Sequence, residues 1–270
     1  RPIRYFRGGV SAFAGAAVAL MLAGCAGGPL PEAPAQDLRT ASDQTDADRR
    51  ANARLQLASA YFERGQLTTA LDEVKLALQA RPDLPEALNL RGLIYGAMGE
   101  SRLAEDSFRR ALAVAPGNGD TLHNYGWYLC QQGRHPEADA QFAQALAQPQ
   151  YRGVTRSLLA RGVCQARAGR WAEAEATLTR SYELDPSNPA TAYNLADVLF
   201  RRGEYERARF YMRRVNAQES TSNAQSLWLA ARIESRMGNR AGAQQLGNRL
   251  RDRFPQSPEA LLFEKGRFDE

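Results

Sequence analysis

Small and apolar positions recur along this chain at a nearly constant interval. Six glycines are separated by 34, 34, 36, 34 and 35 residues, and an alanine follows each of them after five residues. A turn glycine at a fixed offset from a small residue predicts pairs of helices repeated along the chain, and therefore a stack rather than a globule. The pairs are Gly65 and Ala70, Gly99 and Ala104, Gly133 and Ala138, Gly169 and Ala174, Gly203 and Ala208, and Gly238 and Ala243.

The second repeat shows the mechanical reason for each residue type. Gly92 and Ala104 are small and let the two helices approach closely, while Tyr95 and Phe108 fill the space beside that contact. Pro116 lacks a backbone N–H and ends the second helix. This pattern with a period of 34 is typical of the tetratricopeptide repeat (TPR). It predicts an all-α fold, a right-handed TPR superhelix of six helix-turn-helix repeats plus a C-terminal capping helix.

The third repeat is two residues longer than its neighbours, with the insertion around 149–153. In the last segment Ser257 is an expected N-cap and Pro258 stands at the first helical position, which predicts the capping helix. The predicted repeats lie near 51–84, 85–118, 119–154, 155–188, 189–223 and 224–257.

The N-terminus has a different pattern. Three arginines precede an apolar stretch, 10–22, that is too short for a typical membrane-spanning anchor. The stretch ends in Leu-Ala-Gly-Cys at 22–25, which resembles the lipobox of bacterial lipoproteins. We therefore predict a signal peptide over 1–24 and lipidation of Cys25. A general cleavage site with a coincidental cysteine is the alternative.

After the cysteine, residues rich in Pro, Gly, Ala and Asp predict a flexible tether over 25–48, and the TPR solenoid is expected over 49–270. Residue 26 is Ala rather than Asp, so the resemblance to lipoproteins implies export to the outer membrane. We expect a lipid-anchored protein on the periplasmic face of that membrane.

Two further cysteines, Cys130 and Cys164, fall late in the first helices of the third and fourth repeats. First helices of neighbouring TPRs lie side by side, so the two thiols can meet. In an oxidising compartment such a pair predicts a disulfide. Two buried thiols that pack as small apolar groups are the alternative.

The chemistry of enzymes is absent from the sequence. It has two histidines and no metal-ligand, nucleophile or phosphate-binding motif, so we predict a protein that is not an enzyme and needs no cofactor or metal. The net charge of +5 is unevenly distributed, with arginines concentrated in the fifth repeat. We expect no nucleic-acid partner for an exported protein. Interleaved Glu204 and Glu206 favour a solvated helix face there over a docking patch for acidic partners.

A solenoid without a catalytic site works as a binding surface, and its concave groove is lined by fixed positions of the first helices. In the first two repeats these positions form an apolar strip with polar edges, which suits an extended or helical peptide. Phe62 has an alternative role in packing against neighbouring helices. The expected groove residues are Leu55, Ser59, Phe62, Asn89, Leu93, His123 and Trp127.

Several stretches resemble one family closely. They are Asn-Tyr-Gly-Trp-Tyr-Leu-Cys at 124–130 with Gln-Gln-Gly-Arg after it, Ser-Leu-Trp-Leu at 226–229 with Arg232, and 250–260 with Gly-Arg-Phe at 266–268. These stretches are similar to the type IV pilus pilotin lipoproteins (PilF/PilW), and the likeness extends over the predicted mature chain.

The resemblance implies an outer-membrane lipoprotein that binds the pilus secretin and promotes its localisation and multimerisation. We expect a monomer whose partners are secretin subunits and the membrane, the latter through its lipid anchor. The alternative is a periplasmic TPR lipoprotein that serves as a scaffold for another cell-envelope assembly machine.

Overall fold

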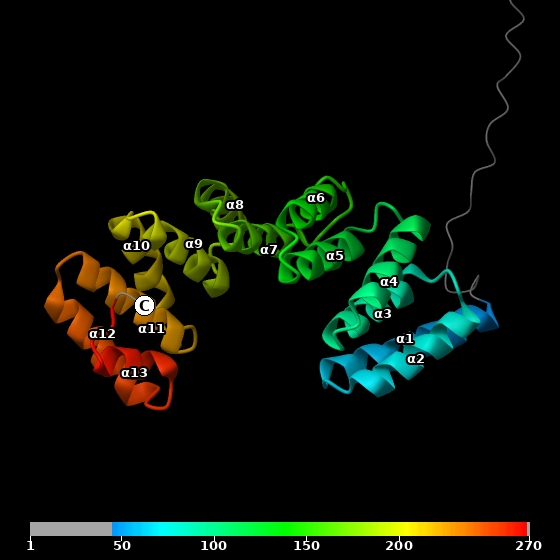
Figure 1. The fold of residues 1–270 in the computed structure, drawn as a ribbon, viewed down its shortest axis with the longest axis horizontal. Helices are drawn as coiled ribbons and strands as arrows, with labels where there is room; N and C mark the ends of the chain where they lie inside the picture. The colour runs from blue at the N-terminus through cyan, green and yellow to red at the C-terminus, as the bar shows by residue number, and fades with distance from the viewer. Residues whose placement is uncertain (1–44, 269–270) are drawn as a thin grey trace, which may run out of the picture. The chain divides into compact units, whose positions relative to one another are not determined.

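The computed structural model describes residues 45–268, which are helical throughout with short turns and no strands (Figure 1). The predicted signal peptide, Cys25 and nearly all of the tether lie outside the described residues. Within 45–268, no helix is both long and apolar enough to cross a membrane. The helices are α1 (Asp46–Glu63), α2 (Leu67–Ala80), α3 (Pro85–Ala97), α4 (Ser101–Val114), α5 (Gly119–Gln131), α6 (His135–Leu146), α7 (Val154–Arg167), α8 (Trp171–Leu184), α9 (Pro189–Arg201), α10 (Tyr205–Val215), α11 (Ala224–Arg236), α12 (Arg240–Arg253) and α13 (Pro258–Glu264).

Twelve of these helices form six consecutive pairs, and α13 follows them. The prediction of an all-α TPR stack with a C-terminal helix is confirmed. The first helix begins earlier than expected, at Asp46 rather than near Ala51. Thr45 accepts a hydrogen bond from the Asp48 N–H, and the Asp48 carboxylate accepts one from the Thr45 N–H. This capping box starts α1 inside the segment that we expected to be tether.

The turn within each helix pair depends on glycine. All six of the regularly spaced glycines have positive φ, between 71° and 81°. Beside the turn, the two helices of a pair approach so closely that a Cβ on Gly92 would lie 2.8 Å from the Phe108 ring. A Cβ on Gly162 would lie 2.5 Å from Leu178 Cγ. The small residues are therefore required by packing, as the sequence pattern predicts.

Neighbouring repeats meet where the first helix of one repeat packs against both helices of the repeat before it. Within the described part of the chain α1 contacts α3, α3 contacts α5, and the series continues to α11, whereas the backbones of successive second helices lie farther apart. We call the surface formed by α1, α3, α5, α7, α9 and α11 the inner face. The predicted groove residues come from α1, α3 and α5.

Ion pairs join the second helix of one repeat to the next repeat. Glu105 on α4 pairs with Arg134, with 2.6 Å between carboxylate oxygen and guanidinium nitrogen. Glu175 on α8 pairs in the same way with Arg207, at 2.8 Å. In the next repeat the charges are exchanged, because α10 carries Arg209 and α11 carries its partner Glu234.

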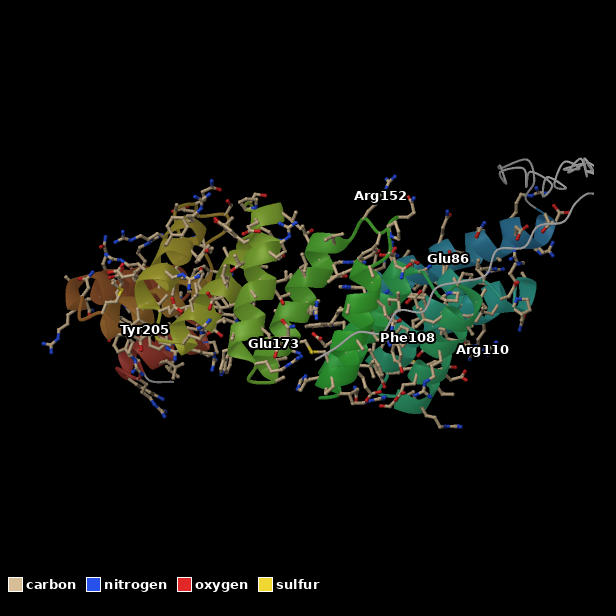
Figure 2. The ribbon with its side chains drawn as sticks, turned by 90° about the horizontal axis from the view of Figure 1, so that it is seen from above. Glu86, Phe108, Arg110, Arg152, Glu173 and Tyr205 are labelled. Carbon is tan, nitrogen blue, oxygen red and sulfur yellow. A yellow bond between two sulfur atoms is a disulfide. The ribbon has the colours of Figure 1, made fainter. Side chains whose placement is uncertain are left out.

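The two-residue insertion forms a short loop between α6 and α7. Figure 2 shows Arg152 on this loop, pointing away from the helices. Tyr151 of the same loop lies over Gly119, where a Cβ would be 2.3 Å from the tyrosine ring. The loop therefore covers the start of α5, and it does so because Gly119 leaves room for a ring.

The last helix closes the C-terminal end of the stack. Ser257 accepts a hydrogen bond from the Ala260 N–H, which is the N-cap predicted from the sequence. Phe263 packs against Gly247 of α12, and the Phe268 ring stacks on Trp228 of α11 with 5.3 Å between centroids. These contacts cover the side of the sixth repeat that would otherwise be exposed at the C-terminal end of the stack.

Candidate functional site

The apolar residues predicted to line the groove in the first two repeats are on α1 and α3, two of the helices that form the inner face. Leu55 and Phe62 of α1 and Leu93 of α3 are half-buried, and all three pack against the core formed by the first two repeats. Part of each side chain therefore supports the fold and part remains accessible. We call Leu55, Phe62, Asn89 and Leu93 the N-terminal strip.

The two polar residues predicted to line the groove in the first two repeats have different environments. Asn89 of α3 accepts a hydrogen bond from the Asn124 side chain of α5, over 3.2 Å between Nδ2 and Oδ1. This bond links neighbouring first helices and orients Asn89 on the inner face. The Ser59 hydroxyl donates to the Leu55 carbonyl, one helical turn back, so it is already satisfied within α1.

His123 does not line the groove as expected. It is buried, with 8% of its surface exposed, and its Nδ1 lies 2.8 Å from the Ser157 hydroxyl. That hydroxyl is also 2.7 Å from the hydroxyl of Tyr151, in the inserted loop. Burial, assisted by the positive charge of Arg156, lowers the pKa of His123 to about 4. The neutral ring is thus part of the packing between the third and fourth repeats.

In the third, fourth and fifth repeats, an aromatic ring lies beside an arginine from the first helix of the next repeat. Trp127 is half-buried, and the Arg167 guanidinium lies 5.0 Å from its ring centroid. Arg201 lies over Trp171 at 5.3 Å in the next repeat. Arg232 lies over Phe200 at 4.8 Å. Such cation–π contacts hold a guanidinium in place while its N–H groups stay available to carboxylates.

Arg167 and the Trp171–Arg201 pair border a groove formed by α7, α8 and α9. The groove encloses about 440 Å³ and is lined by Arg167, Trp171, Asp197 and Arg201 among others. Asp197 pairs with Arg201, at 2.9 Å, so the groove is not purely basic. A volume of this size is large enough for side chains of a bound peptide.

Cys130 of α5 and Cys164 of α7 are joined by a disulfide in the structure, with Cα atoms 5.8 Å apart. The bond connects the first helices of the third and fourth repeats. Figure 2 shows its sulfur atoms near the middle of the chain. Both cysteines are buried.

Sequence reasoning gave His135 no role, yet this side chain lies beside the disulfide. Its Nδ1 is 3.4 Å from Cys164 Sγ, and the ligand atoms of Cys130, His135 and Cys164 all lie within 4.8 Å of one another. Both sulfurs are used in the disulfide, so neither is a thiolate ligand while that bond is intact. No sequence motif signals this cluster, because its members come from three different helices.

The arginines of the fifth repeat are mostly engaged by acidic neighbours. Arg202 and Arg207 both pair with Glu175 of the preceding repeat, and Arg209 pairs with Glu206 and Glu234. These pairs agree with the expected charged helix face. Within residues 45–268, Arg213 has no ion-pair or hydrogen-bond partner.

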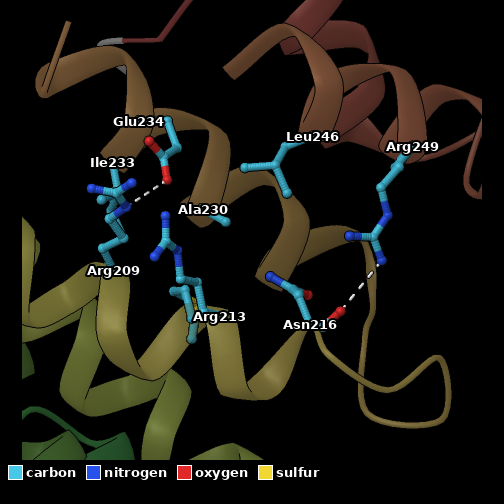
Figure 3. Close-up of a pocket in the computed structure, with 9 residues that line it drawn as sticks. Arg209, Arg213, Asn216, Ala230, Ile233, Glu234, Leu246 and Arg249 are labelled. Carbon is cyan, nitrogen blue, oxygen red and sulfur yellow. Dashed lines mark hydrogen bonds and ion pairs between the residues drawn. The ribbon is translucent and has the colours of Figure 1, made fainter. Parts of the chain in front are cut away.

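Arg213 borders a pocket of about 130 Å³ between α10, α11 and α12, which we call the α10–α12 pocket (Figure 3). Its apolar lining comes from Met212, Ala230, Ile233 and Leu246. Sequence reasoning did not find this pocket, since the residues that form it come from two repeats whose sequence patterns are degraded.

Comparison with known proteins places this repeat architecture in a recognised class. Models of the tetratricopeptide repeat match residues 58–99, 83–150, 126–189 and 165–228. The chain is therefore a TPR protein, and proteins of this class bind protein partners.

Comparison with individual relatives defines the family more closely. The chain is 29% identical over 217 residues to the type IV pilus assembly protein PilF of Pseudomonas aeruginosa strain PAO1, covering 80% of this chain and 86% of PilF. The crystal structure of PilW, described as a widely conserved type IV pilus biogenesis factor, matches with a TM-score of 0.73 and 30% identity, covering 79% of this chain and 97% of PilW. A structure of P. aeruginosa PilF matches with a TM-score of 0.72 and 28% identity, over 82% and 100% of the two chains. This chain belongs to the PilF/PilW family of type IV pilus biogenesis TPR proteins.

The stretches that carry the family resemblance are structural in large part. Tyr125 and Tyr128 stack near Phe108, with ring centroids 5.3 Å and 5.7 Å from it. The Trp228 ring stacks on the Phe268 ring, and Arg232 donates a hydrogen bond to the Phe268 carbonyl. These motifs fix the junction of the second and third repeats and the C-terminal cap.

Proposed function

We propose that this chain is an outer-membrane pilotin lipoprotein that binds the secretin of the type IV pilus. In this role it promotes secretin localisation and multimerisation into the outer-membrane channel. The observation that carries the proposal is the match to PilF and PilW, which extends over about four fifths of the chain. The chain acts by binding, without catalysis or a cofactor.

The N-terminal strip is the proposed secretin-binding surface. Leu55, Phe62 and Leu93 present apolar surface on the inner face, and Asn89 adds a polar group between them. An extended or helical peptide binds such a surface by placing apolar side chains against it at regular spacing. The proposed tether joins the solenoid at α1, so the strip belongs to the repeats closest in sequence to the membrane anchor.

The proposed anchor is the acylated Cys25. Acyl chains hold a protein at the membrane surface without a spanning helix. Changing Cys25 to Ser removes the acylation site, so the variant should leave the outer-membrane fraction in a strain that lacks secretin. Retention of the variant in that strain would mean that lipidation is not the anchor.

A scaffold for another cell-envelope assembly machine is the competing function, because a TPR inner face accommodates many peptides. Affinity capture from envelope extracts distinguishes the two. We expect secretin to be enriched on the immobilised chain relative to the same chain with Phe62→Glu and Leu93→Glu. Enrichment of a different assembly component, with secretin equal on both columns, would favour the scaffold.

A further inference from the structure

The α10–α12 pocket combines an apolar floor with a positively charged rim. Met212, Ala230, Ile233 and Leu246 supply the floor, and the rim includes Arg213 (Figure 3). An apolar cavity of roughly 150 Å³ in a protein accommodates a guest the size of benzene. The pocket's volume of about 130 Å³ therefore fits one aliphatic side chain and is too small for a cofactor.

The wall of this pocket is held rigidly by a buried polar network. The Asn216 side chain accepts hydrogen bonds from the Ser222 hydroxyl, at 3.0 Å, and the Ser226 hydroxyl, at 2.7 Å. It also donates to the Ser226 carbonyl. All three residues are buried. A satisfied network of this kind fixes the position of its members, so the pocket is formed before any ligand arrives.

The charges around the pocket leave an excess of arginine. Glu234 is buried with 6% of its surface exposed, and it is compensated by Arg209, at 2.9 Å, and by a hydrogen bond from Asn239. Arg249 donates one hydrogen bond to the Asn216 carbonyl, at 3.3 Å, and a guanidinium has five N–H groups to offer. Arg213 lacks a partner within residues 45–268, as noted above. Two guanidinium groups are thus available beside an apolar cavity.

We propose that the α10–α12 pocket binds a peptide segment in which an apolar side chain is flanked by carboxylates. The apolar side chain enters the cavity, and the carboxylates pair with Arg213 and Arg249. A phosphate group alone matches the rim but makes no use of the apolar floor. This site lies in the fifth and sixth repeats and is independent of the proposed secretin contact at the N-terminal strip.

The test uses the purified full chain and a blocked peptide, acetyl-Gly-Glu-Leu-Asp-Gly-amide. Two control peptides replace the acidic residues by Gln and Asn, or the Leu by Ser. Methyl resonances of Ile233 and Leu246 report on the pocket directly. We expect saturable shifts with the first peptide at concentrations up to about 1 mM, and at least about tenfold weaker binding of each control.

Matched variants distinguish this site from general electrostatic attraction. Arg213→Glu should weaken binding by about tenfold or more, whereas Arg214→Glu, an identical charge change one residue away and outside the pocket, should have a much smaller effect. Ala230→Val narrows the cavity without a change of charge and should also weaken binding, with circular dichroism and melting used to check the fold. Absence of shifts with the first peptide, or equal losses in Arg213→Glu and Arg214→Glu, would overturn the proposal.

Discussion

The first two and last three repeats share one backbone design but present different chemistry. On α1 and α3 the inner face carries aliphatic and aromatic side chains that are half-buried against their own core. On α7, α9 and α11 the same face carries arginines held over aromatic rings. The fold is set by residues inside each helix pair, so the groove positions are free to differ. The N-terminal repeats are suited to binding apolar side chains of a partner, and the C-terminal repeats are suited to binding acidic side chains.

The disulfide between these regions has the largest expected effect on stability. It closes a loop of 34 residues, which corresponds to about 3 to 4 kcal/mol in the chain-entropy model. Changing Cys130 and Cys164 together to Ser should lower the free energy of unfolding by up to this amount, measured by urea denaturation. The wild type under reducing conditions is the control and should match the double variant. Full reaction of both thiols in unreduced native protein would show that the bond is not formed.

Acid should destabilise the junction through His123. Its pKa is about 4 in the folded protein against an ordinary 6.5, so the unfolded state binds more protons between these values. The contribution of His123 to the free energy of unfolding is therefore retained above about pH 6.5 and is lost as the pH decreases toward 4. The loss from this group is about 2 kcal/mol at pH 5. His123→Gln should remove this part of the pH dependence, whereas His135→Gln should retain it.

Glycine replacements compare the packing inside the third and fourth repeats, on either side of the disulfide. A Cβ on Gly162 would lie 2.5 Å from Leu178, but one on Gly126 would lie 3.1 Å from the Phe142 ring. An extra methyl group in a well-packed core lowers the free energy of unfolding by about 1 to 3 kcal/mol. Replacing glycine by alanine inside a helix raises it by about 0.5 to 1 kcal/mol. Gly162→Ala should thus destabilise by about 1 kcal/mol more than Gly126→Ala. Equal melting temperatures would show that Leu178 moves aside without cost.

The smallest stability effect belongs to the arginines on the inner face. Arg167 is exposed and lies over Trp127, a contact that contributes about 0.5 to 1 kcal/mol. Arg167→Ala should therefore change the melting temperature only slightly, with Arg180→Ala on the exposed surface of α8 as a control. A loss of several kcal/mol would mean that Arg167 is part of the fold rather than of a binding surface.

The repeat architecture could be predicted because close packing inside each helix pair requires small residues at fixed positions in the local sequence. The turn glycines and small residues such as Gly92 and Gly162 each satisfy a packing requirement within one helix pair. The start of α1 was missed by a few residues, although Thr45 and Asp48 form a capping box that is readable in the sequence. The burial of His123 could not be predicted, because Ser157 and Tyr151 cover it from another helix and from the inserted loop. The α10–α12 pocket likewise depends on contacts between repeats.

The central claim is that the N-terminal strip binds secretin and supports its multimerisation. The most direct measurement is the amount of secretin multimer in the outer membrane of cells carrying Phe62→Glu together with Leu93→Glu. The matched control is Leu57→Glu with Leu103→Glu, which adds the same charges at leucines that are 45% and 36% exposed and lie outside the strip. A milder pair, Phe62→Gln with Leu93→Gln, tests lost contact without added charge. We predict that multimers disappear in the strip variants and persist in the control, with helical content and membrane localisation retained in all. Normal multimers in a folded and correctly localised strip variant would contradict the account.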